Sequence, residues 1–533
     1  MKKIRTIEIY DTTLRDGAQS EDMSFSVEDK LRISKKLDTL GVHYIEGGWP
    51  GANPKDLLFF KEAKKLELKK AQMVAFGSTR KARHKVSEDP TLQSLLHAGT
   101  EIVTLFGKSW NLHVKDVLGI SPKKNLELIS DSIAYLHSKG KRVFFDAEHF
   151  FDGFSSDPDY AISVLLTAKK AGAETLILCD TNGGTMPWQV YEVVKKVKEA
   201  VDTPLGIHTH NDSEVAVANA LMAVSAGVCQ VQGTINGFGE RCGNANLTSI
   251  IANLKLKMNI KCIADSALKQ LADVSRFVSE VANLSPNKYQ PYVGTAAFAH
   301  KGGVHVDAVR KNAATYEHVA PESVGNKRRI LISDYSGRGN LLEKAAEYQI
   351  PLAADHPDLH GILHRLKEME GEGYQFEGAE GSLELMMKKK IGVYRRFFQL
   401  AGFRVTVEKG HEGDATSEAT VMVDVNGQIQ HATASGNGPV NALDKALRKA
   451  LQKFYPALSK TLSCMSLLDY KVRVLAAQEG SNSKVRVLCV SGDGKKKWGT
   501  VGVSENIIEA SWQALVDSIE CKLLRDPPTG GCE

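Results

Sequence analysis

The chain has 533 residues, too many for one ordinary core, so two or three domains are expected. Hydrophobic residues make up 42% and charged residues 25%, proportions typical of a soluble globular protein. The net charge of +5 is spread over 68 basic and 63 acidic residues, which argues against a nucleic-acid partner. The lysine runs 388–390 and 495–497 are expected to be solvated turns.

The cysteine pattern and the N-terminal segment bear on the cellular compartment. The eight cysteines contain no CxxC pair, so neither a disulfide framework nor a zinc ribbon is expected. Residues 1–13 carry two lysines but no apolar segment, which predicts a first strand and not a signal peptide. No apolar stretch is long enough to span a bilayer. We therefore expect a cytoplasmic protein without a membrane partner.

Residues 1 to about 260 alternate between short apolar segments and amphipathic helical segments, with a period of roughly 30 residues. Eight such β/α units predict an α/β fold, a TIM (β/α)8 barrel. A doubly wound open sheet is the alternative, but it usually has fewer strands and a glycine-rich first turn, which is absent here. The expected strands are Ile4–Tyr10, Tyr44–Glu46, Gln72–Phe76, Ile102–Phe106, Arg142–Ala147, Thr175–Asp180, Leu205–Thr209 and Val228–Asn236.

Helix boundaries between these strands are marked by local signals. Ser26 is predicted to cap a helix in which Asp29 is the third residue, and Gly41 is predicted to end it. Ser121-Pro122 marks the start of another helix, with proline near its first position. These signals support helices between the strands.

Two further regions follow the barrel, whose catalytic domain is expected to span residues 1–280. Residues 281–395 are predicted to form small linking subdomains, with short helices around 340–348 and 359–371. Residues 396–533 contain two βββα units, each with a glycine-containing hairpin turn. We expect this region to be an α+β regulatory or dimerisation domain.

The segment HTHN contains two histidines that point to the same side of a strand, because side chains alternate with period two. These are His208 and His210, at the end of the seventh expected strand. Asp16 follows the first strand, and Asn244 follows the eighth, its neighbour in a closed barrel. Two imidazoles with oxygen ligands suit Mn²⁺, Mg²⁺ or Zn²⁺. Isolated structural histidines are the alternative for HxH alone.

Other polar residues are expected at the same barrel end. Arg15, beside Asp16, is suited to a substrate carboxylate or a developing alkoxide, and it could also form a salt bridge with Glu148 or Glu46. Glu148 could orient Arg15 or hold a water molecule. Thr181 could hydrogen-bond a substrate carboxylate or cap a helix.

A second cluster lies in HKGGVHVDA, outside the barrel, in a stretch expected to be flexible. His305, oriented by Asp307, would be a competent acid or base, and the segment could cover the site as a lid. A surface loop with chance histidines is the alternative. Tyr316 follows; alone it would be taken as a core tyrosine.

At these residues the chain resembles the DRE-TIM metallolyases, the family of isopropylmalate, homocitrate and citramalate synthases. The matching motifs are DTTLRDGAQ, CDTNGG, HTHND, GFGERCGNAN, HKGGVHVDA and, near the C-terminus, GNGPVNALDKAL. The segments EGGWPGANPKD and NKRRILISDYSGRGN most resemble the citramalate synthases. The motifs are highly specific and extend over nearly the whole chain.

The resemblance implies a role for each matching residue. Metal ligands are Asp16, His208, His210 and Asn244; the substrate contacts are Arg15, Gln19 and Thr181; the catalytic residues are Arg15, Glu148, Glu240, His305, Asp307 and Tyr316. In such enzymes the linker residues reach the active site of the partner subunit, so a homodimer is implied.

The implied reaction is a Claisen-type condensation of acetyl-CoA with pyruvate, followed by thioester hydrolysis to (R)-citramalate. 2-Oxoisovalerate, the acceptor of isopropylmalate synthases, stays the alternative, because two methyl groups are discriminated only modestly by shape. Isoleucine is the implied effector in the first case and leucine in the second. An Fe(II) oxygenase, a retro-aldol lyase and a non-catalytic amino-acid sensor are the competing classes.

Overall fold

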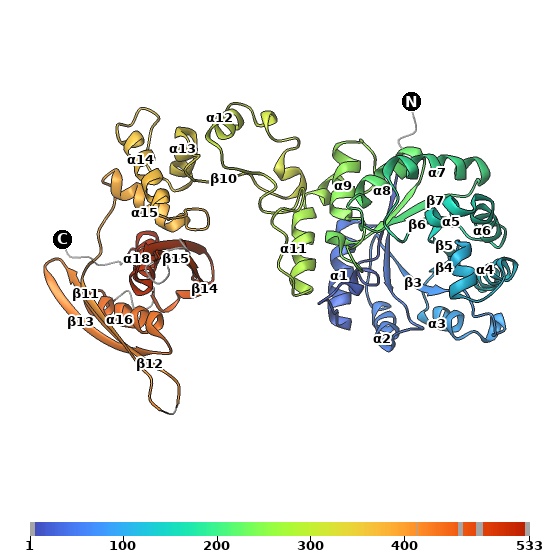
Figure 1. The fold of residues 1–533 in the computed structure, drawn as a ribbon, viewed down its shortest axis with the longest axis horizontal. Helices are drawn as coiled ribbons and strands as arrows, with labels where there is room; N and C mark the ends of the chain where they lie inside the picture. Colours follow the sequence, from blue (N-terminus) through green and yellow to red (C-terminus); the bar gives the residue numbers. More distant parts are fainter. Residues whose placement is uncertain (1–5, 412, 457–461, 476–482, 528–533) are drawn as a thin grey trace. The chain divides into compact units, whose positions relative to one another are not determined.

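The computed structural model describes residues 6–411, 413–456, 462–475 and 483–527 (Figure 1). The chain forms two compact units. The first comprises Met1–Phe298 and Val319–Arg328, and the second comprises Ala299–His318 and Arg329–Glu533. Within the described ranges, no helix combines the length and apolarity needed to cross a membrane.

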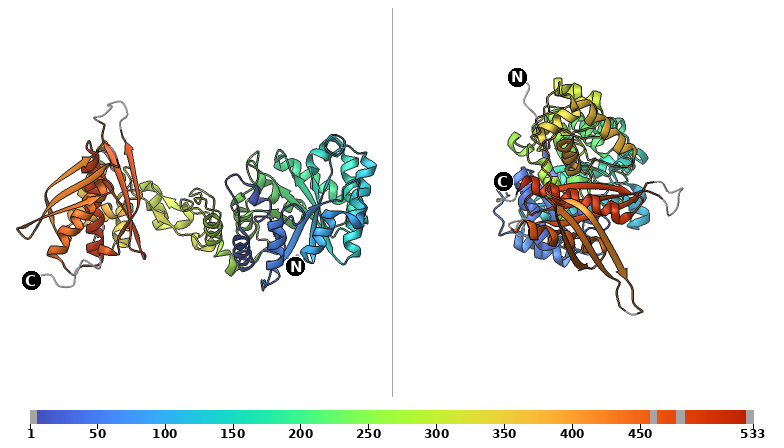
Figure 2. Two further views of the ribbon diagram at one scale, coloured as in Figure 1. Left: turned by 90° about the horizontal axis from the view of Figure 1, so that it is seen from below. Right: turned by 90° about the vertical axis from the view of Figure 1, so that its left-hand side faces the viewer.

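The first unit contains a closed barrel of eight parallel strands in the order β1 to β8, surrounded by helices (Figures 1 and 2). The barrel closes where β1 pairs with β8, with Glu8 opposite Gln230 and Asp11 opposite Gly233. The predicted TIM barrel is therefore confirmed. Its strands are β1 (Glu8–Asp11), β2 (Tyr44–Gly48), β3 (Gln72–Ser78), β4 (Ile102–Lys108), β5 (Arg142–Glu148), β6 (Thr175–Asp180), β7 (Leu205–Thr209) and β8 (Gln230–Gly233).

The end strands are shorter than predicted. β1 begins at Glu8, and Ile4, where we expected it to begin, lies outside the described residues. β8 ends at Gly233, because the chain turns at once into the 3-10 helix Ile235–Gly237. At its carboxyl end β8 therefore leaves the sheet early for the loop that contains Glu240 and Asn244.

The helices around the barrel begin and end where local chemistry directs them. The side chain of Ser26 accepts a hydrogen bond from the backbone N–H of Asp29, and the backbone N–H of Ser26 donates to the Asp29 carboxylate. This capping box satisfies two backbone donors that would otherwise be unpaired. Gly41 ends the helix in a left-handed conformation at φ 85°. The main helices of this unit are α1 (Val27–Leu40), α2 (Pro54–Ala63), α3 (Pro90–Ala98), α4 (Pro122–Ser138), α5 (Phe150–Ser156), α6 (Pro158–Lys170), α7 (Pro187–Ala200), α8 (Ala216–Ala226), α9 (Leu247–Leu256), α10 (Asp265–Leu268) and α11 (Leu271–Val281).

Two apolar layers hold the barrel together. The larger one fills the space between the strands and the outer helices, and includes buried Ile9, Val103 and Leu178. A smaller cluster, which includes Tyr10 and Phe144, fills the inside of the barrel. The interior is therefore a packed core, and the polar residues of the predicted site lie at the carboxyl ends of the strands.

The second unit begins with the segment that we expected to be a flexible lid. It is instead ordered: Ala299–His300 (β9) pairs with Arg329–Ile330 (β10), and Gly303–Lys311 forms helix α12. The apolar residues Val306 and Val309 are buried on one face of the helix, which explains why the segment is helical. The flexible loop was therefore a wrong expectation.

Three more helices follow in this unit. They are α13 (Arg338–Glu347), α14 (Asp358–Gly371) and α15 (Glu380–Lys390), and the first two match the predicted short helices. The lysine run 388–390 forms the last turn of α15 and not a loop, because cations are favourable at a helix C-terminus.

Two three-stranded antiparallel sheets, each with a helix, complete the second unit (Figure 2). The two βββα units are therefore confirmed. The tight turn Asn426-Gly427 has φ of 54° and 85°, the geometry expected for this hairpin sequence. The predicted strand Tyr470–Ala477 ends beyond the described residues. The elements are β11 (Gln399–Glu408), β12 (Thr416–Val425), β13 (Gln428–Gly436), α16 (Pro439–Phe454), β14 (Ser466–Val474), β15 (Val485–Gly492), β16 (Lys497–Ser504) and α18 (Ile507–Arg525).

The predicted domain boundaries at residues 280 and 395 differ from the division into two compact units. Residues 281–298 belong to the first unit, and α15 packs against α18 within the second. The three-domain division therefore stays a prediction. No disulfide joins any two of the seven cysteines in the described part of the chain.

Candidate active site

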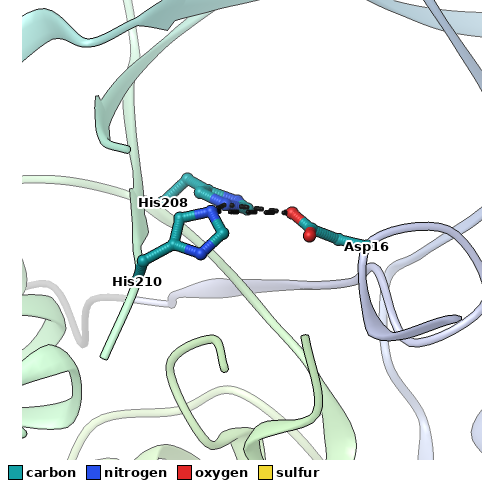
Figure 3. Close-up of side chains that lie close together, drawn as sticks. All are labelled: Asp16, His208 and His210. Carbon is teal, nitrogen blue, oxygen red and sulfur yellow. Dashed lines mark hydrogen bonds and ion pairs between the residues drawn. The ribbon is translucent and has the colours of Figure 1, made fainter. Parts of the chain in front are cut away.

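Three side chains with metal-binding atoms meet at the mouth of the barrel (Figure 3). The Nε2 atoms of His208 and His210 are 3.3 Å apart. Oδ2 of Asp16 lies 3.4 Å from Nε2 of His208 and 3.9 Å from Nε2 of His210. All three residues are buried. Among the described residues, this is the one group of three His, Cys, Asp or Glu side chains with such spacing.

The strand geometry explains this convergence. His208 lies on β7 and His210 directly follows it, so the period of two directs both rings to the barrel interior. Asp16 lies in the turn after β1, whose backbone is held by hydrogen bonds to the carbonyl of Thr12. Asn244 forms an isolated β-bridge with His210, which brings the loop after β8 to the same place.

The donor set fits a divalent cation. Oδ1 of Asn244 is buried and accepts no hydrogen bond from the residues that the structure describes. An acceptor left in this state costs about 1–3 kcal/mol, which a bound cation would offset. Two imidazole nitrogens with carboxylate and amide oxygens suit Mn²⁺, Mg²⁺ or Zn²⁺.

The electrostatic environment favours the ligand forms of these side chains. Burial opposes ionisation of Asp16, but the charge of Arg15 and the hydrogen bond of His208 hold its pKa well below the ordinary value. Burial and the neighbouring His208 lower the pKa of His210 to about 4, so that ring is neutral at pH 7. Burial also lowers the pKa of His208, but Asp16 outweighs it and raises the pKa. A bound cation would replace the proton at His208.

Arg15 is held by Glu46 and not by Glu148. Its Nε donates to Oε2 of Glu46 over 2.6 Å, and its NH1 lies 3.1 Å from Oδ2 of Asp16. Glu148, one of the two residues that could have paired with Arg15, instead forms an ion pair with Lys108. The reason is register: β4 and β5 pair Lys108 directly with Glu148 at the barrel rim. Of the two salt bridges that the sequence allowed, the structure forms the one with Glu46.

A cavity of about 220 Å³ opens above the metal-binding group. One wall is aromatic: Phe76 and Phe106 stack with ring centroids 5.3 Å apart, and Trp49 meets both rings edge-on. The Arg15 guanidinium lies 3.8 Å from the Phe76 centroid, a cation–π contact. The predicted residues that also line this cavity are Arg15, Asp16, Gln19, Glu148, Thr181, His208, His210 and Glu240.

Thr181 does not cap a helix, because α7 begins only after Met186. Its hydroxyl accepts a hydrogen bond from the backbone N–H of His149 over 2.9 Å, and its side chain lines the cavity. Its carbonyl accepts from Arg241, which also pairs with Asp212 through two nitrogens. The four loops that follow β5, β6, β7 and β8 are thereby linked.

Several residues of the site escaped sequence reasoning. Most of them occupy inward-facing positions of strands. The sequence pattern shows that such a position faces inward, but it does not show whether the residue belongs to the site or to the apolar core. These residues are Phe76, Phe106, Lys108, Asp146, Cys179 and Gln232; Trp49, directly after β2, was missed as well.

The predicted acid–base group lies in the second unit. The His305 and Tyr316 rings stack with centroids 4.2 Å apart, and both residues are exposed. Tyr316 is therefore not a core tyrosine. Asp307 pairs with Lys311 at 2.7 Å, as expected for residues four apart on a helix. Positions 305 and 307 face different sides of α12, so the expectation that Asp307 orients His305 is not supported.

A closed (β/α)8 barrel with a carboxylate and two imidazoles at its mouth defines an enzyme of the metal-dependent barrel class. The HMGL-like family model matches residues 6–278, which contain the whole barrel. The model described as "Homocitrate synthase post-HMGL domain-like" matches residues 292–373, and the "LeuA allosteric (dimerisation) domain" matches residues 377–523.

Full-length relatives narrow the class. The (R)-citramalate synthase of Geobacter sulfurreducens is 59% identical over 97% of each chain, and that of Aquifex aeolicus is 55% identical over 98% of each. A probable 2-isopropylmalate synthase of Methanopyrus kandleri is 31% identical over 96% of this chain and 97% of its own. The chain belongs to the HMGL-like family, among its (R)-citramalate synthases.

Proposed function

We propose that the protein condenses acetyl-CoA with pyruvate and hydrolyses the thioester to release CoA and (R)-citramalate, a first step toward isoleucine. The observation that carries this proposal is the identity of 46–59% with five (R)-citramalate synthases, against about 30% with isopropylmalate synthases. 2-Isopropylmalate synthesis is the alternative.

The small cavity supports pyruvate as the acceptor. Its aromatic wall of Trp49, Phe76 and Phe106 leaves about 220 Å³ for substrates, and ring–ring contacts hold the wall in place. A branched 2-oxo acid would have to displace part of this wall. We propose that the methyl group of pyruvate faces these rings.

The charged groups would bind and activate the 2-oxo acid. We propose that Asp16, His208, His210 and Asn244 hold Mn²⁺, Mg²⁺ or Zn²⁺, which when bound polarises the keto group. Arg15, already fixed by Glu46, would donate hydrogen bonds to the oxygen that gains charge during attack, at no cost of reorganisation.

The remaining cavity residues would complete substrate binding. We propose that Thr181 and Gln19 bind the carboxylate of the acceptor. Glu148, paired with Lys108, and the exposed Glu240 are proposed to act in catalysis at the rim of the cavity.

His305 would supply the base that removes a methyl proton from acetyl-CoA. Its exposed ring, stacked on Tyr316, is accessible to a substrate, and its helix fixes its direction. The enolate carbon then bonds to the keto carbon of pyruvate. Water cleaves the resulting thioester, and CoA leaves as a thiol. Asp307 would contribute a negative charge on the same helix as His305.

The C-terminal domain would regulate the enzyme. A family model named for allostery and dimerisation matches residues 377–523, which supports a homodimer. We propose that isoleucine, the end product of a pathway through citramalate, is the amino-acid effector.

The first experiment measures release of free CoA thiol from acetyl-CoA, with Mn²⁺, for pyruvate, 2-oxobutyrate, 2-oxoisovalerate and 2-oxoglutarate. A preference for pyruvate is expected. A preference for 2-oxoisovalerate would instead make the protein an isopropylmalate synthase, with leucine as effector. No release with any acceptor would contradict the condensation itself. Isoleucine and leucine are then added to the productive assay.

A further inference from the structure

Two buried glutamines on β8 differ in their hydrogen bonds. Gln230 and Gln232 lie two residues apart, so both side chains face the barrel interior, and they are 0% and 1% exposed. Neither amide atom of Gln230 has a hydrogen-bond partner among the described residues. Both amide atoms of Gln232 have one. Of these two glutamines on the same face of β8, only Gln232 is therefore hydrogen-bonded through its side chain to described residues.

Gln232 connects a carboxylate to the histidine pair. Its Nε2 donates to Oδ1 of Asp146 over 3.2 Å, and its Oε1 lies 3.0 Å from Nδ1 of His208. An ionised carboxylate only accepts hydrogen bonds, so Asp146 requires the NH2 group of Gln232 on its own side. The amide oxygen is thereby turned toward His208.

This orientation determines the tautomer of His208. An amide oxygen opposite Nδ1 requires the ring to carry its proton there and donate it. The lone pair of Nε2 is then directed at the point where Oδ2 of Asp16 and Nε2 of His210 converge (Figure 3). The second ring has no such constraint, since Nδ1 of His210 is buried without a hydrogen-bond partner in the described structure.

We propose that Gln232, anchored by Asp146, is a positioning residue that holds His208 in the tautomer and orientation required for metal binding. The proposal rests on the metal-ligand role proposed for His208. Side chains of this kind behind a ligating histidine typically contribute 10–100-fold to metal affinity.

The anchor works in either protonation state of Asp146. Burial and the charge of Glu46 raise its pKa to about 7. A protonated carboxyl group still offers one oxygen to Nε2 of Gln232. The connection from Asp146 to His208 therefore does not depend on a fixed charge in the barrel interior.

The test compares Mn²⁺ binding to the metal-free full-length protein by electron paramagnetic resonance, which counts free Mn²⁺. Gln232→Leu is expected to raise the dissociation constant about 10–100-fold. Gln230→Leu is the matched control, because it removes a buried amide from the same strand and face without contacting His208, and it is expected to leave binding within about 3-fold of the parent. Equal dissociation constants for the two variants would overturn the proposal.

Asp146 provides a second comparison that does not alter β8. Asp146→Leu removes the anchor and is expected to weaken Mn²⁺ binding, whereas Asp146→Asn keeps an acceptor oxygen and is expected to bind more tightly than Asp146→Leu. Equal weakening by both would contradict the anchoring role.

His208→Ala distinguishes the metal-ligand role of His208 from the positioning role of Gln232. Weakened Mn²⁺ binding by His208→Ala together with unchanged binding by Gln232→Leu would overturn the positioning role alone. Unchanged binding by His208→Ala would overturn the proposed metal site and the positioning role with it.

Discussion

The guanidinium of Arg15 donates a hydrogen bond from Nε to Oε2 of Glu46 over 2.6 Å. Glu46 is 0% exposed, and its other oxygen accepts from the hydroxyl of Tyr10 at 2.6 Å. Thr12 also donates to Glu46. The arginine is therefore held by a buried carboxylate before a substrate arrives, and its side chain lines the cavity.

Replacing Glu46 by glutamine should release Arg15. The amide offers one acceptor where the carboxylate has two, so a charge-assisted hydrogen bond is lost, at about 1.5–3 kcal/mol. We expect kcat/KM for the 2-oxo acid, measured by steady-state kinetics of CoA release, to fall about 10–100-fold. Glu8→Gln is the control, because Glu8 also bonds a tyrosine from the neighbouring strand but lies at the far end of β1. Equal loss in both variants would contradict a specific role for Glu46.

Asp16→Asn should abolish turnover and weaken metal binding. The variant keeps the volume of the side chain but removes the charge that Arg15 and His208 stabilise. We expect the Mn²⁺ dissociation constant, measured by calorimetry, to rise by more than about 100-fold. Asp22→Asn, at an exposed position in the same loop, should change neither quantity. Retained activity with unchanged affinity in Asp16→Asn would exclude it as a ligand.

Shortening the aromatic wall should broaden the acceptor range. Phe106→Ala opens space beside Phe76 and Trp49, and we expect the activity ratio of 2-oxobutyrate to pyruvate to rise about 10-fold, the usual effect of one methylene in such a pocket. Leu105→Ala on the same strand points to the opposite side and serves as the control. An unchanged ratio in Phe106→Ala would place the alkyl pocket elsewhere.

Asp517 should make the second unit less stable as pH rises. Burial, opposed by Lys389 and Ser382 and aided by Glu520, raises its pKa to about 7. The unfolded chain ionises this group near pH 4, so its effect on the unfolding free energy becomes increasingly unfavourable from pH 4 to 7 and is constant above. The total is about 4 kcal/mol at most.

Asp517→Asn should remove this dependence. The difference in the midpoint of thermal unfolding, variant minus parent, should be larger at pH 8 than at pH 5. Differential scanning calorimetry measures both midpoints. Ser382 donates to Asp517 in the parent and can still donate to an amide oxygen. A difference that is the same at both pH values would refute the raised pKa.

Much of the fold followed from local signals. The limits of β6 and β7 were predicted to the residue, because Thr175–Asp180 and Leu205–Thr209 are apolar segments bounded by turn residues. The capping box at Ser26 and the turn at Asn426-Gly427 involve neighbours in sequence, so they too were readable. α12 was missed, since its glycines indicated a loop and only burial of Val306 and Val309 shows a helix.

The sequence by itself determined which residue types meet at the barrel mouth. Strand period places His208 and His210 on one side, and barrel closure brings Asp16 near them. Only the tertiary structure decided the partners: Glu46 rather than Glu148 for Arg15, and Gln232 for His208. Periodicity states which way a side chain points, but hydrogen bonds depend on ångström distances between strands, and these are set by the register of the closed barrel.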